Sequence, residues 1–80
     1  MRLDTPLHEV VAYLPPEVAG KLTEYEASFQ VEVLGYLRGA IVAMEARGAQ
    51  LDPVSFDAVV YGMGLLAIIA VTNKREPGEA

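Results

Sequence analysis

The sequence predicts an all-α fold, in which a short N-terminal helix precedes a long antiparallel helical hairpin within a single helical domain, residues 1–75. Three observations predict it. Apolar residues recur at spacings of three and four between residues 22 and 44, which indicates a helix with one apolar side. Residues 58–73 carry no charge and are long enough for a second helix. The segment between them, residues 48–52, is a short turn, and such a length makes the flanking helices antiparallel neighbours.

A short helix is predicted at the N-terminus, from Pro6 to Tyr13 or Leu14. Thr5 followed by proline is typical of a helix start, with a hydroxyl at the N-cap and proline at the first helical position. The Pro15-Pro16 pair ends this helix, because a residue that precedes proline is disfavoured in the α region.

The first long helix is predicted as one helical region over residues 16–47, bent near Gly20. A restart at Glu24 is the alternative, because residues 23–26 have the threonine-to-glutamate spacing of a capping box. Gly48 supplies the residue type that most often follows the last turn of a helix.

The second long helix is predicted to begin at Pro53 and to end at Asn73. Asp52 is a good N-cap, and proline suits the first helical position. Two basic residues follow Asn73 and place cations at the negative end of the helix dipole. The polar tail, residues 76–80, is expected to be flexible.

Residues 58–71 are apolar on every side of the predicted helix, and such a helix must be buried on every side, in protein or in lipid. A chain of 80 residues without cysteine cannot cover that helix alone, so we expect a homodimer that forms a helical bundle. Small residues spaced four apart favour close helix crossings. Self-association is therefore assigned to Gly35, Gly39, Ala43, Ala58, Gly62, Leu66 and Ile69.

A membrane span is the alternative for this apolar segment. Crossing a bilayer core takes about twenty apolar residues, and the uncharged run is shorter than that. Extending it to residues 53–72 reaches the length but includes Asp57, whose carboxylate is costly inside a bilayer. Length therefore favours burial in protein.

Composition argues against several classes of function. The net charge of −5 and the six scattered basic residues do not suit nucleic-acid binding, which needs clustered Lys and Arg. The chain has no Cys and one His, so neither a thiolate site nor a multi-histidine metal site is expected. Ser28 and Ser55 have no His near them in sequence, as nucleophilic catalysis would require. We therefore expect no enzyme, no cofactor and no metal, and the lack of a signal-peptide core predicts a cytoplasmic protein.

The expected function is that of a small acidic protein-interaction module, an adaptor, inhibitor or regulator of a larger cytoplasmic protein. A phage- or plasmid-type inhibitor is a specific version, by analogy with such proteins, which are often small, acidic and helical. Partner binding is assigned to Tyr13, Glu24, Glu26 and Glu32, because complementary charge speeds encounter and aromatic residues supply affinity. The same glutamates could serve only to keep an apolar oligomer soluble. Reversing them to lysine is expected to leave folding nearly intact.

Two alternative functions remain open. One is a small membrane-anchored protein that uses residues 53–72 as its span. The other is a helical bundle that binds a small apolar ligand in a glycine-lined groove.

Overall fold

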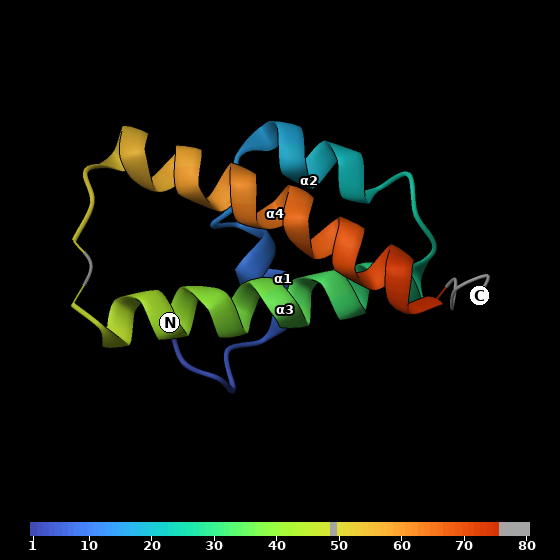
Figure 1. The fold of residues 1–80 in the computed structure, drawn as a ribbon, viewed down its shortest axis with the longest axis horizontal. Helices are drawn as coiled ribbons and strands as arrows, with labels where there is room; N and C mark the ends of the chain where they lie inside the picture. The colour runs from blue at the N-terminus through green and yellow to red at the C-terminus, as the bar shows by residue number, and fades with distance from the viewer. Residues whose placement is uncertain (49, 76–80) are drawn as a thin grey trace.

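A computed structural model describes residues 1–48 and 50–75 of the chain (Figure 1). In these residues all regular structure is helical and there is no strand, which confirms the all-α prediction. The helices of this part are α1 Leu7–Val11, α2 Pro16–Leu22, α3 Ala27–Ala46 and α4 Pro53–Arg75.

The two long helices, α3 and α4, pack side by side as the predicted antiparallel hairpin (Figure 1). The short helices pack on this hairpin, α1 against α3 and α2 against α4. One short helix was predicted before the hairpin and the structure has two, because the region expected to be a single helix over residues 16–47 is broken.

One apolar core joins the four helices. Val10 of α1 and Val18 of α2 are closed off from solvent, as are Leu37 of α3 and Val60 of α4. Each short helix therefore contributes to the same core as the hairpin on which it packs. The buried apolar residues are Val10, Leu14, Val18, Leu22, Phe29, Val33, Leu34, Leu37, Ile41, Val60, Ala67, Ile68 and Val71.

The break between α2 and α3 shows that the predicted capping box is wrong. The Thr23 hydroxyl donates a hydrogen bond of 2.6 Å to the carbonyl oxygen of Gly20, so it is directed back at α2 and not forward at a new helix. Glu26 is the N-cap of α3, in an extended conformation and with no side-chain capping bond. The helix starts beyond Glu24, the predicted restart, because residues 23–26 turn the chain from α2 into the hairpin.

The N-terminal lead, residues 1–6, is held on α3, and α1 is shorter than predicted. Pro6 is the N-cap of α1 and makes no side-chain capping bond, while the Thr5 hydroxyl accepts a bond from the backbone N–H of Arg2. Arg38 of α3 donates to the carbonyl oxygen of Thr5 over 2.9 Å. These contacts fix the lead against the hairpin before α1 begins.

The ends of the α3–α4 turn follow the predicted local signals. Asp52 accepts a hydrogen bond of 2.9 Å from the backbone N–H of Ser55, which is the N-cap contact expected at the start of α4. Gly48 has a φ of 77°, the left-handed conformation that glycine adopts most readily after a helix. α4 continues to Arg75, past the predicted end at Asn73. The predicted tail, residues 76–80, lies outside the described residues.

Candidate interaction surface

A groove runs along the seam between α3 and α4, on a side of the hairpin to which neither short helix contributes. Two adjoining hollows form it, of about 440 Å³ near the turn and about 270 Å³ farther along, and both are lined by Ala40 and Met63. We call this surface the hairpin face. Its lining residues are Tyr36, Leu37, Ala40, Ala43, Met44, Arg47, Met63, Leu66, Ala67 and Ala70.

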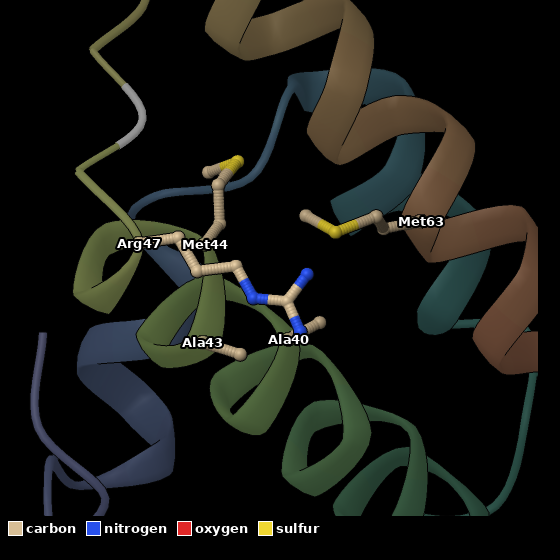
Figure 2. A pocket seen from close by; sticks show the side chains of 5 residues that line it. All are labelled: Ala40, Ala43, Met44, Arg47 and Met63. Carbon is tan, nitrogen blue, oxygen red and sulfur yellow. The ribbon is translucent and has the colours of Figure 1, made fainter.

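The larger hollow owes its shape to small residues on α3 and flexible ones around them (Figure 2). Ala40 and Ala43 form a low floor, while Met63 extends from α4 toward α3 and Met44 rises into the gap from the α3 side. The Arg47 side chain runs back along α3, so that its guanidinium lies over Ala40. The result is an apolar hollow with adaptable walls and one cation at its rim.

The outward side of α4 extends this apolar surface. Leu66 and Ile69 are 66% and 54% exposed, and Ala58 is exposed as well. Only 28% of the most apolar window of α4 is buried within the chain. A helix apolar on every side was expected to be covered on every side, and the single chain covers only its inner side.

The small residues spaced four apart on α3, which we call the glycine ridge (Gly35, Gly39 and Ala43), do not form the crossing between α3 and α4. A Cβ placed on Gly35 or Gly39 would meet no atom within 4 Å, and the same holds for Gly62 of α4. The close approach within the chain is at Gly64, where α2 packs on α4. Contact of Gly35, Gly39, Ala43 and Gly62 with another chain therefore stays a prediction.

The glutamates assigned to partner binding divide into two kinds. Glu26 and Glu32 form ion pairs within the chain: Arg75 contacts Glu26 at 2.9 Å and Glu32 at 2.6 Å, and Lys74 contacts Glu32 at 2.9 Å. Glu24 is exposed. Two of the three carboxylates thus tie the start of α3 to the end of α4.

This cluster lowers the pKa of both carboxyl groups. Hydrogen bonds from Lys74 and then from Arg75 hold the pKa of Glu32 below its ordinary value. The pKa of Glu26 is lowered by a hydrogen bond from the Ser28 hydroxyl and by Arg75. The Arg75 guanidinium also lies 5.3 Å from the centre of the Phe29 ring, within cation–π range.

These pairs bear on the expectation that reversing Glu24, Glu26 and Glu32 to lysine leaves folding nearly intact, which stays a prediction. Lysines at the last two positions would place like charges against Arg75 and Lys74. Within residues 1–48 and 50–75, no hydrogen bond or ion pair joins the exposed Tyr13 to any of these glutamates. Their assignment to one partner-binding surface stays a prediction.

Sequence reasoning named Ala43 and Leu66, which line the groove, but it assigned no role there to Tyr36, Met44, Arg47 or Met63. Tyr36 was weighed only as an alternative to Leu37 on the inward side of α3, and the structure leaves it half exposed. A search for three- and four-residue spacing on the side of α3 next to its buried residues would have found Tyr36, Ala40, Ala43 and Arg47 together.

The polar side chains considered for chemistry have local structural partners. Ser28 donates to Glu26, and the backbone of Ser55 is bonded to Asp52. Among the described residues there is no group of three or more His, Cys, Asp or Glu side chains able to hold a metal ion. Comparison of the chain with protein-family models, curated proteins and solved structures gave no match.

Proposed function

We propose that this chain is a small acidic, non-enzymatic protein-interaction module that works as a homodimer through the hairpin face. The observation that carries the proposal is the exposure of α4, which is the most apolar helix of the described chain and has Leu66 and Ile69 on its outward side. Contiguous apolar surface of this kind marks interaction sites on small soluble proteins.

The distribution of charge supports the same proposal. Charged residues are depleted at the centre of protein interfaces and tolerated at the rim. On the hairpin face Arg47 is the one charged lining residue of the two hollows, and it stands at an end. The net charge of −5 resides elsewhere on the molecule, where it would keep an assembled oligomer soluble.

A larger protein partner is part of this proposal. We place the module in the cytoplasm, as an adaptor, inhibitor or regulator whose partner meets the exposed Glu24 and Tyr13 or the part of the hairpin face left free in the dimer. Glu26 and Glu32 contribute less to such binding, since Lys74 and Arg75 already neutralise them.

Replacing Leu66 by glutamate tests the role of the hairpin face. Leu3 provides a matched control, because it is the same residue type with the same exposure of 66%, in the N-terminal lead. Light scattering without detergent is expected to show a dimer for the parent and for Leu3→Glu, and a monomer for Leu66→Glu. A parent chain that stays monomeric at micromolar concentration, or equal behaviour of the two variants, would contradict the proposal.

A membrane-anchored protein is the second candidate, favoured by one observation. α4 is long and apolar enough to cross a bilayer, with a mean hydropathy of 2.1 over its most apolar window, and it ends in Lys74 and Arg75. Against it, the same two residues are engaged with Glu32 of α3, and Asp57 lies within the helix. Flotation with phosphatidylcholine vesicles separates the candidates. An interaction module is expected to stay in the aqueous fraction, whereas a membrane-anchored protein is expected to float to the top of the gradient with the vesicles.

A further inference from the structure

We infer that two copies of this chain pack α3 against α3 in antiparallel orientation, about a two-fold axis that passes between Gly39 and Ala40. This inference rests on the proposed function, and it specifies which side of the hairpin meets the second copy. The contact is made by residues spaced three and four apart on one side of α3, which we call the α3 stripe: Glu32, Tyr36, Gly39, Ala40, Ala43 and Arg47.

Symmetry decides which residues of the stripe meet. In a two-fold contact each residue pairs with one of the other copy, and the same pair occurs twice. With the axis between positions 39 and 40 of antiparallel helices, Gly39 faces Ala40 of the second copy. One turn outward Tyr36 faces Ala43, and one further turn outward Glu32 faces Arg47.

The middle pairs are complementary in size. Tyr36 is 50% exposed, so its own chain leaves about half of the side chain uncovered and available to the second copy. Ala43 of the second copy lines the hollow of about 440 Å³, with Ala40, Met44 and Met63 around it (Figure 2). The tyrosine ring fits there as a knob, with methionine walls that adjust to it, and the two-fold axis repeats the contact.

At the axis Gly39 and Ala40 themselves present little more than backbone. The helices can approach closely there once the Arg47 side chain, which lies over Ala40 in the single chain (Figure 2), turns outward to Glu32 of the second copy. Among the described residues no atom lies within 4 Å of a Cβ built on Gly39, although a glycine inside a helix costs about 1 kcal/mol relative to alanine. A close crossing with the second copy makes use of that space. It also lays the second α3 over the groove and covers part of Leu66.

The outer pairs are complementary in charge. Glu32 and Arg47 are the charged members of the stripe, and the antiparallel contact sets each opposite the other. Arg47 forms no ion pair within the part of the chain that the structure describes. Glu32 already accepts bonds from Lys74 and Arg75, which offset its charge. Arg47 of the second copy joins this network as a further donor, for which a carboxylate has room. A parallel contact would instead oppose Glu32 to Glu32 and Arg47 to Arg47.

A charge exchange between two variants tests this register. Arg47→Glu alone places Glu32 opposite a glutamate in both outer pairs, and Glu32→Arg alone places two arginines there. Each variant is expected to raise the dimer dissociation constant by about tenfold or more, since opposed like charges oppose association. When the two are mixed in equal amounts, both outer pairs of the mixed dimer become Glu–Arg, and the dissociation constant is expected to return to within a few-fold of the parent value.

Two controls separate the register from general effects of charge and folding. Lys21→Glu, on the exposed side of α2, changes the net charge as Arg47→Glu does and is expected to leave the dimer unchanged. Because Glu32→Arg also removes contacts to Lys74 and Arg75, circular dichroism checks that this variant folds. If it does not, Tyr36→Ala still tests whether Tyr36 adds to the contact. Its control is Tyr61→Ala, because Tyr61 is exposed on α4 and is not among the residues that line the two hollows.

The outcomes distinguish this inference from the proposed function. Suppose that the parent dimerises, that Leu66→Glu abolishes the dimer, and that Arg47→Glu and Tyr36→Ala leave it unchanged. This result would overturn the α3 register, but the proposal of a homodimeric interaction module would stand. Loss of the dimer in each single-charge variant without recovery in the mixture would also overturn the register. Recovery in the mixture, with no effect of Lys21→Glu, supports it.

Discussion

Gly64 of α4 lies directly against Val18 of α2, so closely that a Cβ on the glycine would come within 2.8 Å of the valine Cγ1. Both residues belong to the interior, where Val18 is 1% exposed. Valine is held in few rotamers by its branched Cβ, so it cannot turn aside to admit another atom. This contact is where α2 docks on the hairpin.

Gly64→Ala is therefore expected to destabilise the fold. Overpacking a filled core costs about 1–3 kcal/mol, which exceeds the gain of about 1 kcal/mol from replacing a helical glycine by alanine. Gly20→Ala is the control, since Gly20 is exposed on α2 and a Cβ there meets nothing; it is expected to keep or raise stability. Urea unfolding of both variants measures the difference, and equal stability would show that α2 shifts at no cost.

The ion pairs between the ends of the hairpin predict a dependence of stability on pH. The pKa values of Glu26 and Glu32 are lowered in the folded protein, so the folded state favours their charged forms. This contribution is present above the ordinary glutamate value of 4.5, and it is lost as the pH falls through the lower folded values.

Arg75→Gln tests that contribution, because Arg75 contacts both carboxylates. The variant is expected to melt below the parent at neutral pH and low salt. The difference in melting temperature between Arg75→Gln and the parent should become smaller in acid, where the carboxylates are protonated. It should also become smaller at high salt, since the pairs are exposed and screened. Arg2→Gln is the control, as its partner Asp4 is only two residues away. If the melting temperature of Arg75→Gln lies below that of the parent by the same amount at every pH, the effect would be assigned to packing of Arg75 on Phe29.

Gly39→Leu separates the fold of one chain from its association. Within the chain there is space beside Gly39, so leucine is expected to leave the unfolding of a monomer unimpaired, and helix propensity favours it. At a close helix crossing the same side chain would hold the two copies apart. Light scattering should therefore show a weaker dimer, with unchanged helical content by circular dichroism. A variant that melts and associates like the parent would mean that the glycine ridge faces solvent.

The α3–α4 hairpin could be predicted from sequence because its signals are local. The Asp52 cap contact is made to a backbone N–H three residues away, and the conformation of Gly48 is a property of that residue. Such signals act between residues that are close together in the sequence, so the sequence alone shows them. They located the turn between the long helices.

The break at residues 23–26 could not be predicted in the same way. Thr23 has the residue types around it for a capping box, yet its hydroxyl bonds backward to Gly20. That bond spans three residues, as a forward capping bond would, so local chemistry allows either direction. α2 ends there while its Val18 packs on Gly64, in a helix more than forty residues later in the chain. Propensity is a weak prior when such a tertiary contact competes with it.

The sequence by itself determined the helical class, the turn and the excess of apolar residues, since these depend on composition and on spacing along the chain. Only the tertiary structure decided which apolar residues are left over. Packing α1 and α2 on one side of the hairpin buries Leu37 and Val60 and leaves Tyr36 and Leu66 at the surface. The packing of α3 against α4 also brings Arg75 to Glu32, so a residue assigned to partner binding joins two helices of its own chain as well. Both outcomes depend on contacts between distant parts of the chain, to which the periodicity of one helix is insensitive.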